Sequence, residues 1–167
     1  MIKKYVTEKF KGLKYGDRPY IVHLEETASI CEEFNGEPIH QSLALLHDIL
    51  EEPTGVSLFE LSKNFGIKLA WKTYLISDEA GKNRTEKKAK TYPKIKSDLD
   101  VTFVKCADRI ANGRNCIKDN PQLLKMYKKE YPEFKEQLWN EKFTRLTSIG
   151  IDLKLIEMFQ VMDKMFL

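Results

Sequence analysis

The sequence predicts an all-α protein, a helical bundle with short connections. Apolar residues recur at helical spacing along most of the chain, and the only run rich in β-formers is short, at residues 101–104. The 6 prolines and 8 glycines mostly separate these periodic segments. A length of 167 residues suits one domain with its own core, so we expect residues 1–167 to form a single domain. The expected helices cover residues 19–34, 38–52, 57–66, 67–76, the middle of 81–93, 101–117, 121–139 and 151–166.

Proline and glycine mark the limits of the first two helices. Pro19 suits the first position of one helix, because its missing N–H is not needed there, and Asn35-Gly36 should end it. Pro38 opens the next helix in the same way, and Pro53 should stop it.

Capping residues mark several later helices. Ser57 followed by Glu60 has the capping-box pattern, and Gly66 is a suitable end for that short helix. Asp98 or Asp100 could cap the helix that contains residues 101–117, and Asn120 precedes a proline that opens the following one. The final apolar helix, residues 151–166, should cover the core or form an oligomer contact.

Composition excludes several classes of protein. The chain has 28 basic and 25 acidic side chains, a formal charge of +3, and no apolar run of the ~18 residues that span a bilayer. Its first residues lack the apolar stretch of a secretory signal. The three cysteines, an odd and scattered set, do not form a disulfide framework. We therefore expect a cytoplasmic protein with no membrane partner.

Polar side chains on apolar helical stripes are the most informative feature. His47 shares its face with leucines, Asp108 occupies a core-facing position beside valines and an alanine, and His23 lies on the inner side of its helix. Each has an ordinary explanation: a lone inward histidine is usually a hydrogen-bonded core residue, and Asp108 could pair with Arg109. Together with Asp48, however, they form a mixed nitrogen and oxygen set that suits Mn, Fe or Zn.

The same four residues resemble a known signature. His23, His47-Asp48 and Asp108 follow the H…HD…D pattern of the HD-domain metal phosphohydrolases. Residues 16–23 (GDRPYIVH), 44–52 (ALLHDILEE) and 104–112 (VKCADRIAN) resemble, in order and spacing, three blocks of RelA/SpoT-type alarmone hydrolases. Residues 81–84 and 90–94 look like stretches of the small stand-alone relatives. The resemblance covers about residues 9–140.

This resemblance implies a fold, a cofactor and an activity. It implies an HD-domain helical bundle that holds one divalent metal, Mn²⁺ being the usual one in this branch, through His23, His47, Asp48 and Asp108. It implies hydrolysis of the 3′-pyrophosphate of ppGpp or pppGpp, an anionic nucleotide substrate. The chain is too short to add the synthetase domain of the bifunctional members.

Two acids after the HD pair match the family's catalytic pair. Glu51 lies four residues after His47 on the expected helix and by resemblance positions or deprotonates the attacking water. Glu52 stands where the family usually has Asp, so its longer side chain changes its reach. Without the neighbouring ligands, Glu51-Glu52 would be interpreted as a solvated helix end.

Basic and aromatic residues are the expected substrate contacts. The stretch 82–96 holds seven basic residues and one acid; most are expected to face solvent, but Arg84 could bind phosphate with two parallel hydrogen bonds. Tyrosines of the 121–139 helix could line a base pocket or belong to an ordinary amphipathic face. The candidate substrate-binding residues are Lys14, Arg18, Arg84, Lys87, Arg109, Asn112, Tyr127 and Tyr131.

Two departures from the family pattern and the alternative functions stay open. Phe10, and Ala111 and Gly113 on either side of Asn112, replace common family residues, which leaves the nucleotide uncertain. The alternatives are another nucleotide substrate (the 3′-phosphate of NADPH or an adenine alarmone) and a non-catalytic, antitoxin-like binding module. Nucleic-acid binding through residues 82–96 is disfavoured because aromatic residues are not interleaved with the charges.

Overall fold

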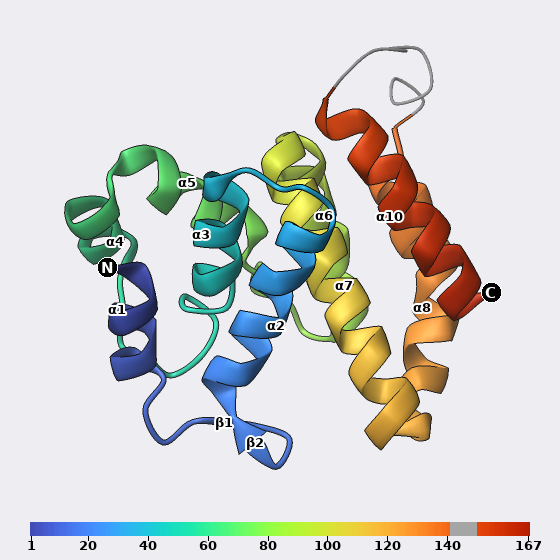
Figure 1. Cartoon of the computed structure of the whole chain (residues 1–167), viewed down its shortest axis with the longest axis horizontal. Helices are drawn as coiled ribbons and strands as arrows, with labels where there is room; N and C mark the ends of the chain where they lie inside the picture. The colour runs from blue at the N-terminus through green and yellow to red at the C-terminus, as the bar shows by residue number, and fades with distance from the viewer. Residues whose placement is uncertain (141–149) are drawn as a thin grey trace.

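Helix α7 (Leu99–Asp119) runs through the middle of the molecule, and most other helices pack against it (Figure 1). The computed structural model describes residues 1–140 and 150–167, so residues 141–149 of the predicted domain lie outside the described part. The remaining elements are α1 (Ile2–Lys9), β1 (Lys14–Tyr15), β2 (Arg18–Pro19), α2 (Tyr20–Glu33), α3 (Pro38–Leu46), α4 (Leu58–Phe65), α5 (Ile67–Ile76), α6 (Arg84–Lys96), α8 (Pro121–Leu138) and α10 (Ile151–Phe166).

The predicted capping residues act as expected. The Ser57 hydroxyl accepts a hydrogen bond from the Glu60 N–H at 3.1 Å, and α4 ends at Gly66, whose φ of 85° suits glycine. Asp98 accepts from two N–H groups of the first turn of α7, and the Asn120 amide oxygen accepts from the N–H of Leu123. These contacts supply the hydrogen bonds that the first turn of a helix cannot make internally.

Four parts of the structure differ from the sequence expectation. Helix α1 was not predicted, nor was the hairpin in which β1 pairs antiparallel with β2 through the Gly16 turn (φ 61°). Helix α6 continues past Pro93 to Lys96. Helix α3 ends at Leu46 and not at residue 52.

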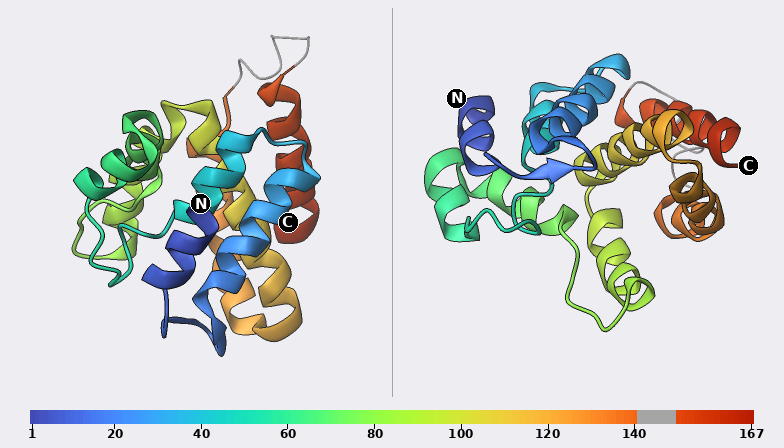
Figure 2. Two further views of the ribbon diagram at one scale, coloured as in Figure 1. Left: turned by 60° about the vertical axis from the view of Figure 1, so that its left-hand side comes forward. Right: turned by 90° about the horizontal axis from the view of Figure 1, so that it is seen from below.

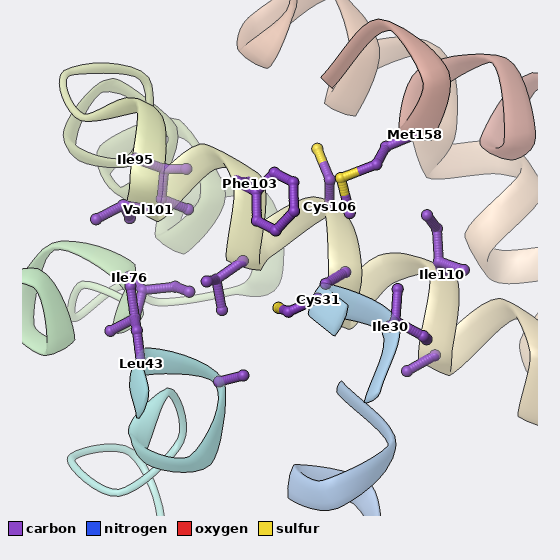
Figure 3. Close-up of a cluster of buried hydrophobic side chains, with 14 of the residues drawn as sticks. Ile30, Cys31, Leu43, Ile76, Ile95, Val101, Phe103, Cys106, Ile110 and Met158 are labelled. Carbon is purple, nitrogen blue, oxygen red and sulfur yellow. The ribbon is translucent and has the colours of Figure 1, made fainter. Parts of the chain in front are cut away.

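The hydrophobic core gathers on the two sides of α7. Figure 3 shows Phe103 and Cys106 of α7 between side chains of several other helices. Buried side chains contributed by α2, α3, α5, α6 and α10 include Ile30, Cys31, Leu43, Ile76, Ile95 and Met158. Burying such aliphatic side chains stabilises the fold by roughly 1.5–3 kcal/mol each.

Helix α10 packs against α7 and α8 at the end of the molecule opposite α1 and α4 (Figures 1 and 2). Its face made of Leu155, Met158, Phe159, Met162 and Phe166 is buried. The approach to α7 is close at Gly113, where an added Cβ would lie 2.6 Å from the Phe166 ring. Within the described residues, no helix is both long enough and apolar enough to cross a membrane.

Candidate metal centre

Two imidazoles and two carboxylates converge beside α7. The Nε2 atoms of His23 (α2) and His47 lie 3.3 Å apart. Oδ2 of Asp48 lies 3.6 Å and 3.1 Å from these two nitrogens, and Oδ1 of Asp108 (α7) lies 3.4 Å and 3.7 Å from them. The imidazoles are buried, with 1% of each side chain exposed, so the four groups form a compact polar cluster inside the apolar bundle.

The cluster fits a divalent cation. Bonds of about 2.0–2.2 Å to one ion would hold neighbouring donor atoms about 3.0–3.5 Å apart, close to the spacings above. Donor atoms of His23, His47 and Asp108 all lie within 4.8 Å of one another; Asp48 is outside that group of three but close to both imidazoles. Imidazole and carboxylate together suit first-row transition metals.

The environment of each ring orients it toward the cluster. Nδ1 of His47 donates to the carbonyl of Ala44 at 2.7 Å, which leaves Nε2 for a ligand. The ring of His23 stacks on that of Tyr15, with centroids 4.1 Å apart. Among the described residues, no hydrogen-bond partner reaches the buried Nδ1 of His23, so its Nε2 is the nitrogen directed at the cluster.

His47 and Asp48 follow directly on the end of α3. In a continuous helix, adjacent residues point about 100° apart. The chain leaves the helix at Leu46 and continues in turns, in which the N–H of Glu51 donates to the carbonyl of Asp48 at 3.0 Å. The predicted helix through residue 52 is therefore wrong: the N–H of Ile49 donates to the carbonyl of Leu46, three residues back, at 3.0 Å, and the regular helix does not continue.

Electrostatics favour charged forms in the cluster. Burial lowers the pKa of His23, but hydrogen bonds to Asp108 and Asp48 outweigh it and raise this pKa to about 9. Burial opposes ionisation of Asp48, yet the charge of His47 and the hydrogen bonds of both imidazoles hold its pKa well below the usual range. A bound cation would replace the imidazole protons that balance these carboxylates.

Three residues of the cluster, His23, Asp48 and Asp108, line a cavity of about 160 Å³. Both predicted catalytic acids line it. The Glu51 carboxylate accepts from the N–H of Asp78 at 3.0 Å, and loss of hydration raises the pKa of Glu51. The hydroxyl of Tyr20 donates to Asp48 Oδ2 at 2.8 Å and to Glu52 Oε1 at 3.1 Å, which connects the second acid to the cluster.

Four basic side chains line the wall of the same cavity. Arg84 and Arg109 were predicted from the sequence; Lys88 and Lys105 were missed. Lys88 pairs with Asp78 at 2.9 Å, and Lys105 Nζ lies 3.0 Å from Asp108 Oδ2. Helical spacing could have found both lysines, because Lys88 follows Arg84 by four residues and Lys105 precedes Asp108 by three.

Two further predicted residues line this cavity. Asn112 donates to Asp108 Oδ1 at 2.6 Å and accepts from the hydroxyl of Tyr15. Tyr127 lies against the guanidinium of Arg109, whose carbon is 4.6 Å from the ring centroid. The cavity lining is Tyr15, Tyr20, His23, Asp48, Glu51, Glu52, Asp78, Arg84, Lys88, Lys105, Asp108, Arg109, Asn112 and Tyr127.

The remaining candidate substrate residues lie outside this cavity. Arg18 pairs with Glu26 at 2.7 Å and lines an adjoining groove that shares Tyr15 and Asn112 with the cavity. Lys14 and Lys87 are exposed and line neither space. Lys87 is therefore on the outer face of α6, and Lys88 takes the inward position.

Tyr131 also lies away from the cavity. Its side chain is fully buried, and its hydroxyl donates to the carbonyl of Phe159 at 3.2 Å and to Asp163 at 2.6 Å. The sequence prediction that Tyr131 could line a base pocket is not supported, because this ring fills the interface between α8 and α10.

Comparison with known proteins supports the fold. The chain matches no protein-family model, and no curated protein matches its sequence. Its structure is similar to that of a metazoan protein described as an ortholog of SpoT that hydrolyses ppGpp and plays a role in starvation responses. The TM-score is 0.69 at 19% identity, over 95% of this chain and 92% of that one. The two chains share one fold. The predicted all-α bundle of the HD type is confirmed.

Proposed function

We propose that this protein is a metal-dependent phosphohydrolase that removes the 3′-pyrophosphate of ppGpp or pppGpp. The observation that carries the proposal is the juxtaposition of a fitting metal cluster and four basic side chains in one cavity. A pyrophosphate group needs both, because its oxygens carry several negative charges and the reaction needs an activated water. The structural similarity to a ppGpp hydrolase supports the choice of substrate.

The proposed ligands are His23, His47, Asp48 and Asp108, and the proposed ion is Mn²⁺. When bound, such an ion acidifies a water and polarises a phosphate oxygen. The buried imidazoles and carboxylates fix its position, and Tyr20 holds Asp48 in place through its hydroxyl.

The chain's own residues would then carry the proton transfer and the charge. Glu51, whose pKa is raised by loss of hydration, accepts the proton of the attacking water. The water oxygen bonds to the phosphorus that is attached to the 3′ oxygen. The bond between this phosphorus and the 3′ oxygen breaks, and pyrophosphate leaves. The 3′ oxygen takes up a proton from solvent. Arg84, Lys88, Lys105 and Arg109 would neutralise the phosphate oxygens.

The nucleoside would extend from the cavity into the adjoining groove of about 640 Å³, which Arg18 lines. Asn112 and Tyr15 line both spaces and are hydrogen-bonded to each other, so they are suited to contact the ribose or base. We propose an anionic nucleotide in the cytoplasm as the partner of this site; Lys14, Lys87 and Tyr131 have no part in it.

A substrate panel tests the function. The Mn²⁺-loaded protein is incubated with ppGpp, pppGpp, their adenine analogues and NADPH, and the products are identified. We expect pyrophosphate from ppGpp and pppGpp, and loss of this activity in Asp108→Ala. Faster turnover of NADPH or an adenine nucleotide would contradict the substrate assignment. Absence of all turnover with metal bound would contradict catalysis and favour a binding module.

A further inference from the structure

Glu130 of α8 lies between two arginine side chains at the edge of the cavity. Its Oε1 accepts from Nε of Arg84 at 2.5 Å, and its Oε2 accepts from Nη2 of the same arginine at 3.0 Å. Oε2 also accepts from Nη1 of Arg109 at 3.5 Å. One carboxylate thus joins α6, α7 and α8 through the two guanidinium groups. No sequence motif singles out Glu130.

The hydrogen bonds to Arg84 occupy one defined edge of its guanidinium. A guanidinium has five N–H groups in a plane, and Nε with Nη2 forms one two-donor edge. Glu130 binds that edge. The opposite edge, formed by Nη1 and Nη2, remains available for a second bidentate contact with an anion such as phosphate. Glu130 therefore fixes which edge of Arg84 is available to a ligand.

The two arginines depend on Glu130 to different degrees. Arg109 has only 4% of its side chain exposed and is flanked by the rings of Tyr127 and Phe134, 4.6 Å and 4.7 Å from the guanidinium carbon. Arg84 has 49% of its side chain exposed. In the described part of the chain, Glu130 is the only hydrogen-bond partner of the Arg84 side chain. Loss of Glu130 should release Arg84 and leave Arg109 in place.

We propose that Glu130 is a positioning residue that directs the free edge of Arg84 at the phosphate groups of the substrate. The proposal rests on the proposed function, because it takes a phosphate-bearing ligand for the cavity. Holding a long, exposed side chain in its binding orientation before the ligand arrives removes part of the entropic cost of binding. Glu130 also reduces the net positive charge of the wall, so a purely electrostatic effect would have the opposite sign.

The test is a double-mutant cycle with two readouts. Glu130→Ala, Arg84→Ala and the double variant are compared with wild type for binding of inorganic pyrophosphate to the Mn²⁺-loaded protein, and for KM and kcat with ppGpp. We expect Glu130→Ala to weaken pyrophosphate binding and raise KM about tenfold with kcat nearly unchanged. In the Arg84→Ala background, the second substitution should have no further effect, because its target is gone.

Matched variants separate positioning from folding and from charge. Glu130→Gln keeps the side-chain shape and one acceptor, so it should lie between wild type and Glu130→Ala. Glu136→Gln removes one charge from an exposed residue of the same helix and should match wild type. Melting temperatures identify variants that fail to fold.

Three results would overturn the proposal: tighter pyrophosphate binding in Glu130→Ala, an additive double variant, or wild-type protein that binds no pyrophosphate. Wild-type protein that binds pyrophosphate but hydrolyses no nucleotide would instead contradict the proposed function, and the binding cycle would still decide the role of Glu130.

Discussion

His23 and His47 approach each other through their Nε2 atoms, which lie 3.3 Å apart in the interior of the bundle. Two buried imidazoles at this distance need a proton or a cation between them, or nearby negative charge. The carboxylates of Asp48 and Asp108 supply that charge on either side. This arrangement makes a divalent cation the natural occupant of the cluster.

The ligand assignment predicts metal stoichiometry. After loading with Mn²⁺ and dialysis, wild-type protein should retain about one ion per chain. His47→Ala, Asp48→Ala and Asp108→Ala should each retain little, because each loses a donor atom. Elemental analysis gives the ion content directly. Asp152→Ala, which removes a carboxylate from α10 far along the chain, is the control and should bind like wild type. Full occupancy in Asp48→Ala would remove that residue from the ligand set.

Tyr20 should tune the metal affinity without contacting the ion. Its hydroxyl holds Asp48 and Glu52, so Tyr20→Phe should weaken Mn²⁺ binding about tenfold, the scale of lost support for a metal ligand. Competition with a calibrated chelator measures the change. Tyr5→Phe is a matched control, because the hydroxyl of Tyr5 donates to Glu60 outside the cavity. Equal affinities for wild type and Tyr20→Phe would show that Asp48 needs no such support.

Close packing at Gly113 should limit substitution there. A Cβ would lie 2.6 Å from the Phe166 ring and against the sulfur of Met165, so Gly113→Ala should destabilise the protein by about 1–3 kcal/mol despite the better helix propensity of alanine. Urea denaturation measures the loss. Phe166→Leu should restore part of it in the double variant. A stabilised Gly113→Ala would mean that α10 moves away from α7 at little cost.

The half-buried ion pair of Lys72 and Asp100 should make the stability of the protein depend on pH in acid. Burial opposes ionisation of Asp100, but hydrogen bonds from Lys72 at 2.9 Å and from His40 at 3.0 Å lower its pKa below the usual value. A lowered pKa in the folded state means that the stabilisation is present above the usual carboxyl pKa of about 4 and is lost as the pH falls below it.

Asp100→Asn isolates this contribution. At pH 7 it should reduce the free energy of unfolding by about 1–2 kcal/mol. The difference between wild type and variant should shrink as the pH drops below about 4. Urea titrations at several pH values measure it. A difference that stays constant down to pH 3 would show that Asp100 contributes through its shape and not its charge.

Local sequence signals predicted much of the fold because caps act over one turn. Ser57, Gly66, Asp98 and Asn120 each mark a helix limit that the structure reproduces. The end of α3 could not be predicted in this way. The leucine spacing continues past Leu46, and no capping residue marks the point where the chain turns.

In the candidate site, too, some residues could be predicted from local sequence signals and others could not. His23, His47, Asp48 and Asp108 stood out because polar groups on an apolar stripe need an explanation, and the family resemblance gave it. Helical spacing could have found Lys105, three residues before Asp108, but Glu130 gave no local signal. Lys105 pairs with Asp108 of its own helix, whereas the role of Glu130 depends on Arg84, which lies on another helix.

The most direct test of the central claim is the identity of the products from ppGpp. Phosphorus NMR of the Mn²⁺-loaded protein with ppGpp should show equimolar GDP and inorganic pyrophosphate, and neither product with Asp108→Ala. Release of orthophosphate, or unchanged ppGpp in the presence of fully metal-loaded wild-type protein, would contradict the proposal that this cavity cleaves the 3′-pyrophosphate.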